Sequence, residues 1–345
     1  MVSIVRVLVI GDPHFDMKSL SIVDTFIRQT IDLVKSNKPD VVVILGDVLH
    51  THEKARIECH SRAVSWFKEL ATYSHTIVLI GNHDRANNGV YLTNEHFFTG
   101  LEGYDGLVIV ATGPYSFDVS NGGESLRFVA VPYVPKGRLH EALSKLTIPL
   151  AERRPIAVFG HQDLKGAKMG AVICKDGDIW PEDYPLLVNG HYHEHQTLNG
   201  NIIMPGTPYQ TTYNEEMNKG VYMFTFTEGK AMPEIKRIKL NLRIKMSVRK
   251  TPSEFAAMKV PDLSCELRII VQGEESEIAA LKVSKQYKEF SKLTNVKIVL
   301  SPILNVVALK KTVEVSEGFY HLFYKSISED PDLIQLYQEL LGDMQ

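Results

Sequence analysis

Several apolar segments of this chain end in a glycine followed by aspartate, asparagine or histidine, and this repeated ending constrains the fold most. The residues before it, such as 4–10 and 41–45, are rich in β-branched side chains, which is typical of buried strands. Ligands of α/β sheets bind beyond the carboxyl ends of the strands. Glycine would let the backbone turn sharply there without a side-chain clash. We therefore expect five strands to bring polar side chains to one rim, through Gly11-Asp12-Pro13-His14, Gly46-Asp47, Gly81-Asn82-His83-Asp84, Gly160-His161 and Gly190-His191-Tyr192-His193.

The order of the other patterns predicts a mixed α/β fold. Apolar residues recur at helical spacing over residues 20–34, and residues 63–71 also have a helical pattern. These two segments separate the first three predicted strands, so the chain begins β-α-β-α-β, an order that indicates an α/β core. After the first two, the predicted strands of this core lie at residues 76–80, 126–131, 156–159, 186–188, 201–208 and 220–226.

The composition of the 345-residue chain changes near residue 233, which predicts more than one domain. Residues 238–249 alternate between apolar and mostly basic side chains, as expected of a half-buried strand that leads into a second unit. That unit has the pattern strand (267–271), helix (274–291) and strand (296–300), and residues 316–345 predict two short helices. The predicted domains are residues 1–235, 236–312 and 313–345.

The charge of the chain limits how it could bind nucleic acid. Its formal net charge is −3, so DNA would have to contact a local basic surface or bound metal ions. The outer side of residues 238–249, with Lys239, Arg243, Lys245 and Arg249, is one candidate surface. Contact with the DNA backbone and an ordinary solvated strand face are equally good interpretations of this pattern.

Cysteine content and hydropathy indicate a cytoplasmic protein. The three cysteines are far apart and form neither a disulfide framework nor a zinc motif, so we expect reduced thiols. No apolar stretch approaches the ~20 residues that a membrane helix needs. The N-terminal apolar run stops at Asp12 and has no small-residue cleavage site, which argues against a signal peptide. In a bacterium we expect association with the nucleoid, and in a eukaryote a nuclear location.

The donor types at the predicted rim favour a pair of metal ions. Carboxylate, imidazole and amide oxygen suit Mn²⁺, Fe²⁺ or Zn²⁺, whereas no thiolate is present in these blocks. Asp47 is a single carboxylate that could bridge two cations, and cations about 3.5–4 Å apart can hold a phosphoryl group and activate a water. Each block alone is more often a simple turn, but the ordered set favours metal binding.

The blocks resemble the calcineurin-like metallophosphoesterase superfamily, whose pattern is D-x-H, G-D, G-N-H-D, G-H and G-H-x-H. The resemblance implies a four-layer αββα sandwich with two divalent metal ions, of which Mn²⁺ is favoured and Mg²⁺, Fe²⁺ or Zn²⁺ are alternatives. It implies that His83 acts on the leaving oxygen, where the alternative is a role in the turn alone. Asp84 would be placed to orient His83. One implied metal site is Asp12, His14, Asp47 and His193, and the other is Asp47, Asn82, His161 and His191.

A closer resemblance is to SbcD-type double-strand-break repair nucleases, including phage recombination endonuclease subunits. It covers about residues 4–226 and rests on Gly46-Asp47-Val48-Leu49-His50, Val131-Pro132-Tyr133, Pro205-Gly206-Thr207-Pro208 and Lys219-Gly220-Val221-Tyr222. It implies a DNA exonuclease and endonuclease with an SbcC-type SMC-like ATPase as partner. It also implies a homodimer built from helices of the core, for which the sequence offers the amphipathic stretches 20–34 and 63–71. His50 would contact phosphate, although an ordinary surface position is its alternative. Residues 236–312 would be a capping domain.

Other functions remain open at this stage. The same core could be a small-molecule or protein phosphatase, or a scaffold without catalytic activity. An intact ligand set argues against the scaffold, and the second unit and the helical tail argue for the nuclease, because a minimal phosphatase needs neither. The apolar faces of the tail could dock on the ATPase or, equally well, on the protein's own core.

Overall fold

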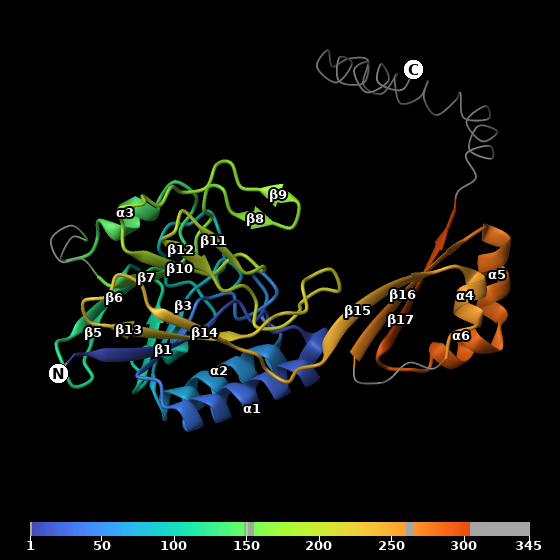
Figure 1. Cartoon of the computed structure of the whole chain (residues 1–345), viewed down its shortest axis with the longest axis horizontal. Helices are drawn as coiled ribbons and strands as arrows, with labels where there is room; N and C mark the ends of the chain where they lie inside the picture. The colour runs from blue at the N-terminus through green and yellow to red at the C-terminus, as the bar shows by residue number, and fades with distance from the viewer. Residues whose placement is uncertain (1, 148–149, 151–154, 260–264, 304–345) are drawn as a thin grey trace, which may run out of the picture. The chain divides into compact units, whose positions relative to one another are not determined.

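Buried β-branched strands form the centre of the first of two compact units, which meet in the chain at Lys245 and Met246. The computed structural model describes residues 2–147, 150, 155–259 and 265–303 (Figure 1). The first sheet has the order β14-β13-β1-β2-β3-β4, in which β1 to β4 are parallel and β13 runs antiparallel to β1. Its strands are β1 (Ile4–Ile10), β2 (Val41–Ile44), β3 (His75–Leu79), β4 (Leu107–Val110), β13 (Val221–Thr227) and β14 (Glu234–Ile238).

A second sheet of the same size packs against the first. Its order is β11-β12-β10-β7-β6-β5, and its four central strands are parallel. The parallel strands of each sheet end at one edge, as the sequence predicted. The strands are β5 (Tyr115–Val119), β6 (Leu126–Ala130), β7 (Ala157–Gly160), β10 (Leu186–Asn189), β11 (Gln196–Leu198) and β12 (Ile202–Met204).

Alternation along the strands divides the apolar core into layers. Val7 of β1 faces the second sheet, where it joins the cluster of Phe128 and Phe159. Its neighbour Leu8 faces the other way, towards Phe26 and Trp66 of the helices α1 (Leu20–Asn37) and α2 (Ile57–Ala71), which Figure 1 shows together on one side of the sheet. The outer face of the second sheet is covered by α3 (Leu139–Leu143) and by loops that carry the hairpin of β8 (Lys168–Met169) and β9 (Val172–Ile173). The predicted four-layer αββα sandwich is confirmed, although its second outer layer is mostly irregular.

Two element predictions in the first unit were incomplete. Helix α2 begins at Ile57, earlier than the predicted residue 63, and single 3-10 turns at Met17–Ser19 and Thr99–Leu101 were not predicted. The single strand predicted at 238–249 is two strands, because β14 ends at Ile238 where its pairing with β13 ends. Strand β14 therefore belongs to the first sheet, and the first unit extends to Lys245 rather than ending at the predicted residue 235.

The second unit is a small three-stranded sheet with helices. Its order is β15-β16-β17, with β16 parallel to β17, and Phe255, Ile269 and Phe290 lie in its core. The helix predicted at 274–291 is interrupted at Ser284, whose side chain accepts a hydrogen bond from the Tyr287 backbone and starts a new helix. The elements are β15 (Ile244–Lys250), α4 (Pro252–Ala256), β16 (Cys265–Gly273), α5 (Glu275–Val283), α6 (Lys285–Phe290) and β17 (Val296–Pro302).

Two further predictions concern the C-terminal segment and membrane helices. The helices predicted at 316–345, and the whole of the predicted domain at 313–345, lie outside the described residues. Among the helices that the structure describes, none is both long and apolar enough to span a membrane.

Candidate metal centre

The ends of five parallel strands meet at one place, and each supplies polar side chains. Strands β1, β2 and β3 of the first sheet are followed by Asp12 and His14, by Asp47, and by Asn82 and His83. Strands β7 and β10 of the second sheet are followed by His161 and by His191 and His193. All seven predicted ligands take part in one network of contacts. Those that are fully or nearly fully buried are Asp12, His14, Asp47, Asn82 and His161.

Three of these residues adopt a backbone conformation that side chains disfavour. His14, Asp47 and His191 have φ angles of 44°, 46° and 74°. The left-handed region is uncommon for residues other than glycine and is a feature that functional sites often hold at some cost in stability. The surrounding sheets must therefore impose these conformations, which aim the side chains inward.

The glycines before the ligands mainly provide space. Only Gly46 of the five has a positive φ, of 104°. A Cβ atom at Gly190 would lie 2.6 Å from Asp12 Oδ1 and 2.8 Å from His161 Nδ1, and one at Gly81 would overlap the Asp47 carboxylate. The expectation that glycine avoids a side-chain clash before the ligands is therefore confirmed at Gly46, Gly81 and Gly190, where close approach of other groups leaves no room for a Cβ atom.

Around Asn82, hydrogen bonds already join the donors. The Asn82 Oδ1 atom accepts from His161 Nε2 at 3.0 Å and from His191 Nδ1 at 2.9 Å. His161 Nδ1 donates to the Leu45 carbonyl at 2.8 Å, and its Nε2 lies 3.3 Å from Asp47 Oδ2. Burial lowers the pKa of His161, but the carboxylates outweigh burial and raise it to about 10. We call Asn82, His161 and His191 the Asn82 half of the centre.

Around Asp12, by contrast, donor atoms are left without partners. Within the part of the chain that the structure describes, neither Asp12 carboxylate oxygen nor His14 Nδ1 has a hydrogen-bond partner, and all three atoms are buried. His14 Nε2 and His193 Nε2 face each other at 3.1 Å. Burial raises the pKa of Asp12 to about 6 and lowers that of His14 well below its usual value. We call Asp12, His14 and His193 the Asp12 half.

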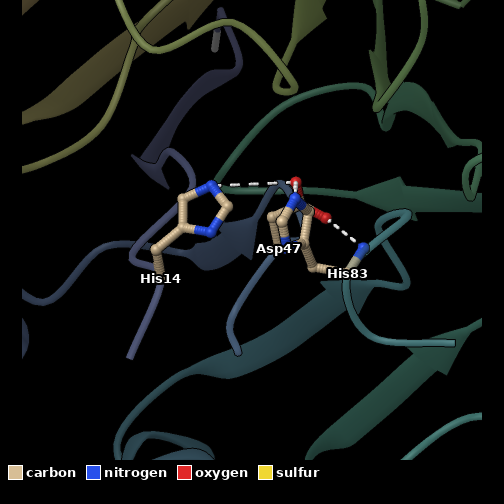
Figure 2. A group of neighbouring side chains, drawn as sticks. All are labelled: His14, Asp47 and His83. Atoms are coloured by element: carbon tan, nitrogen blue, oxygen red, sulfur yellow. Dashed lines mark hydrogen bonds and ion pairs between the residues drawn. The ribbon is translucent and has the colours of Figure 1, made fainter. Parts of the chain in front are cut away.

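This arrangement fits two divalent cations. A buried carboxylate without hydrogen bonds is costly, and a cation between it and the two facing imidazoles would remove that cost. Ligand atoms of Asp47, His161 and His191 lie within 4.8 Å of one another, and so do those of His14, Asp47 and His83 (Figure 2). Asp47 belongs to both groups, which is the position that a bridging carboxylate needs. The donors suit Mn²⁺, Fe²⁺ or Zn²⁺.

His83 lies beside the shared carboxylate, and its ring is held by a carbonyl. Its Nδ1 donates to the His50 carbonyl at 2.7 Å, so Nε2 is the free nitrogen and lies 3.9 Å from Asp47 Oδ2. The idea that Asp84 orients this ring was wrong, because Asp84 instead accepts from the backbone N–H groups of Val48, Leu49 and Gly81. Asp84 therefore fixes the loops that carry Asp47 and His83.

The outer rim includes one predicted residue and one that the sequence did not reveal. The predicted residue His50 is exposed, with its ring centroid 5.6 Å from that of His14. His52 lies in none of the predicted blocks, yet its ring centroid is 3.6 Å from that of His83. Both histidines therefore lie near enough to the centre to meet a substrate.

Two carboxylates behind the ligands were also missed. Asp163 Oδ1 lies 3.2 Å from His191 Nε2, and Glu215 Oε1 lies 3.3 Å from His193 Nδ1. Burial raises the pKa of Glu215, but His193, Lys219 and Thr211 outweigh it and hold the pKa at about 2. Glu215 follows no strand-end glycine, so the strand-end pattern gave no signal for it. Asp163 lies three residues after Gly160, the same offset as His14 from Gly11, and this spacing could have indicated it.

An αββα sandwich with aspartate, asparagine and histidine donors at its strand ends defines a metal-dependent phosphoesterase. The chain belongs to the calcineurin-like phosphoesterase family, which matches residues 5–195. It is 32% identical over 292 residues to "Putative phosphoesterase 078R" of Invertebrate iridescent virus 3, covering 83% of this chain and 81% of the relative. It is 30% identical over 284 residues to "Putative phosphoesterase 244L" of Invertebrate iridescent virus 6, covering 81% and 98%.

Proposed function

We propose that this phosphoesterase is a two-metal-dependent DNA exonuclease and endonuclease that works in DNA repair or recombination. The observation that carries the proposal is the pair of donor groups that share Asp47, since two cations can clamp both the attacking and the leaving oxygen of a phosphodiester. The resemblance of four sequence blocks to SbcD-type nucleases supports DNA as the substrate. A separate second unit follows the phosphoesterase core in the chain, as a capping domain would, and supports DNA as the substrate further.

The proposed chemistry divides between the cations and the protein. Bound cations, of which we favour Mn²⁺, would polarise the phosphoryl group and lower the pKa of the attacking water. His83 has Nδ1–H engaged by the His50 carbonyl, so only its Nε2 can carry the proton that goes to the leaving oxygen. The imidazole would be charged before the transfer and neutral after it. Burial lowers the pKa of His83 and so disfavours the charged form, and Asp47 Oδ2, 3.9 Å away, offsets part of that effect.

The substrate is tested with purified protein and Mn²⁺. Linear duplex DNA, single-stranded DNA, bis-p-nitrophenyl phosphate and p-nitrophenyl phosphate are compared at equal protein concentration. The proposal expects cleavage of DNA and of the diester, with little activity on the monoester. Efficient hydrolysis of the monoester without DNA cleavage would instead identify a phosphatase on the same core.

We also propose an SbcC-type SMC-like ATPase as the partner, docked through residues 313–345. The proposal rests on the sequence resemblance and on the apolar residues at helical spacing in this segment. Deletion of residues 314–345 should abolish co-purification with the ATPase and leave Mn²⁺-dependent hydrolysis unchanged. Unfolding of the shortened chain would show that the segment belongs to the protein's own core.

A homodimer is the third part of the proposal. The sequence offered the amphipathic stretches at 20–34 and 63–71 as its interface, but the buried residues of α1 and α2, such as Phe26 and Trp66, pack on the chain's own first sheet. A dimer would therefore have to use exposed side chains of these helices, such as Ile57, which is 79% exposed. Light scattering over a range of concentrations tests it, and a monomer throughout would exclude it.

A further inference from the structure

Two sequence blocks that have no role in the proposed chemistry converge on one metal-centre histidine. These are Pro205-Gly206-Thr207-Pro208 and Lys219-Gly220-Val221-Tyr222. The backbone N–H of Thr207 donates to the His193 carbonyl at 3.0 Å, and Lys219 Nζ donates to the same oxygen at 2.6 Å. Both blocks therefore hold the backbone of His193, although they follow both His193 and β12 in the chain.

Gly206 explains why the first block has a glycine. Its φ is +79°, and a Cβ atom there would lie 2.6 Å from the His193 carbonyl oxygen. Its own carbonyl packs so closely on Gly11 that a Cβ at Gly11 would overlap it. The block is thus pressed between the end of β1, which carries Asp12, and the carbonyl of His193.

The ring of His193 is held from the same side by Glu215. The Glu215 carboxylate meets His193 Nδ1 at 3.3 Å, Thr207 Oγ1 at 3.3 Å and Lys219 Nζ at 3.3 Å. It also accepts from the backbone N–H of Thr211 at 3.1 Å and from the Thr211 hydroxyl. The side chains of Glu215 and Lys219 are only 8% and 5% exposed. Such a buried, fully partnered carboxylate is fixed in position.

We propose that Glu215 and Lys219 form a positioning clamp for His193, and that the clamp determines the affinity of the Asp12 half for its cation. Glu215 holds the proton of His193 on Nδ1, so the lone pair of Nε2 is directed at the point that His14 Nε2 also faces. Lys219 fixes the backbone and neutralises Glu215. Both are positioning residues. This inference rests on the proposed metal centre, because it needs His193 to be a ligand.

The test is Mn²⁺ binding by the full-length protein, measured by calorimetry. Glu215→Gln keeps the size of the side chain and removes its charge. The substitution should weaken binding of one of two Mn²⁺ ions by about 10–100-fold and leave the other unchanged, since such partners typically contribute that factor. Glu216→Gln is the matched control, because Glu216 is the exposed neighbour in sequence, and it should bind both ions as the unchanged protein does. Equal Mn²⁺ binding by the Glu215 and Glu216 variants would overturn the clamp.

A milder variant guards against misfolding. Thr211→Val removes one hydroxyl partner of Glu215 and should weaken the same ion by a smaller factor. Electron paramagnetic resonance gives a second readout, because a half-filled centre should show the signal of an isolated Mn²⁺ ion at concentrations where the unchanged protein shows a coupled pair. If Glu215→Gln fails to fold and Thr211→Val binds both ions normally, the clamp is also overturned.

His193→Ala separates this inference from the proposal beneath it. Loss of one Mn²⁺ ion in His193→Ala, with normal binding in Glu215→Gln, would refute the clamp and leave the metal centre standing. Retention of both ions in His193→Ala would refute the ligand assignment itself, and the clamp with it.

Discussion

The two halves of the metal centre are built from similar residues but are held in different ways. In the Asn82 half, one amide oxygen accepts hydrogen bonds from both imidazoles, and the Leu45 main-chain carbonyl accepts one from the other nitrogen of His161. In the Asp12 half, a buried carboxylate and an imidazole nitrogen have no hydrogen-bond partner in the described structure, and two imidazole nitrogens face each other. The polar side chains of the Asn82 half therefore hydrogen-bond to one another, whereas the unpartnered buried atoms of the Asp12 half would be satisfied by a bound cation.

The two halves also differ in how deeply the residues that contact their histidines are buried. The Asp12 half has the more completely buried support, since Glu215 and Lys219 are both shielded from solvent. The Asn82 half has a weaker outer support, since Lys136, which pairs with Asp163, is 44% exposed. Candidate ligands that do not hydrogen-bond to one another depend on outer residues to orient them. Ligands that do hydrogen-bond to one another depend on such residues less.

The largest effect is expected where the halves join. Asp47→Asn should reduce hydrolysis of bis-p-nitrophenyl phosphate by at least about 10⁴-fold, because the two cations supply several kcal/mol of transition-state stabilisation and Asp47 is the group they share. Metal analysis of the purified variant should show fewer than two Mn²⁺ ions. Two retained ions with full activity would mean that the halves do not meet at Asp47.

His83 decides whether the Asp12 half has a further ligand. His83→Ala should lower DNA cleavage by roughly 10²–10⁴-fold, the usual contribution of a general acid, while both Mn²⁺ ions stay bound. The loss should be smaller for bis-p-nitrophenyl phosphate, because its leaving group needs no proton. Loss of an ion would place His83 in the Asp12 half, consistent with its grouping with His14 and Asp47, and would refute its role as the acid.

That the candidate ligands come together could be predicted from the sequence, but the contacts that support them from behind could not. Asp12, Asp47 and His161 follow strands whose β-branched runs fix where each strand ends, so local pattern alone places them at one edge. Glu215 and Asp163 lie in loops and reach the centre only through tertiary contacts with histidines of another segment. No local periodicity describes such a contact.

The fold shows the same division between local and non-local information. Strands β1, β2 and β3 were predicted within a residue of their observed ends, because their burial on both faces leaves a continuous apolar run. The alternating residues 238–249 predicted one strand, but only Ile238 pairs with β13, and the residues from Ile244 onward belong to the sheet of β16. Alternation of apolar and polar residues indicates which side chains are buried, but it does not show where the partner strand ends.

Burial of the Asp12 carboxyl group without a cation should make the stability of the protein depend on pH. In metal-free protein the pKa of Asp12 is raised from 3.8 to about 6, so the folded state binds this proton more tightly than the unfolded state. The resulting stabilisation is present below pH 3.8 and is lost as the pH rises towards 6. The melting temperature of EDTA-treated protein should therefore fall over this range, by about 2–4 °C per kcal/mol lost.

Asp12→Asn tests that assignment. The variant should lose much of the fall below pH 6 and keep the part due to Asp84, whose pKa burial raises to about 7. Saturating Mn²⁺ should also remove the Asp12 part of the fall in the unchanged protein, because a bound cation keeps that carboxylate ionised, and should leave the part due to Asp84. A melting temperature that is flat between pH 4 and pH 6 without metal would show that Asp12 has no such cost of burial.

The smallest effect is expected behind the Asn82 half. Asp163 lies 3.2 Å from His191 Nε2, but Asn82 holds the same ring from the other side at 2.9 Å. Asp163→Asn should therefore weaken the cation of this half by about 10-fold or less, at the low end for such a partner. The measurement is Mn²⁺ calorimetry in the His193→Ala background, where only this half retains its ion. Asp176→Asn is the control, since Asp176 pairs with the same Lys136 yet is 76% exposed, and it should have no effect. If Asp163→Asn weakens binding more than Glu215→Gln does, the Asn82 half is not the self-supporting one, and the contrast between the halves is reversed.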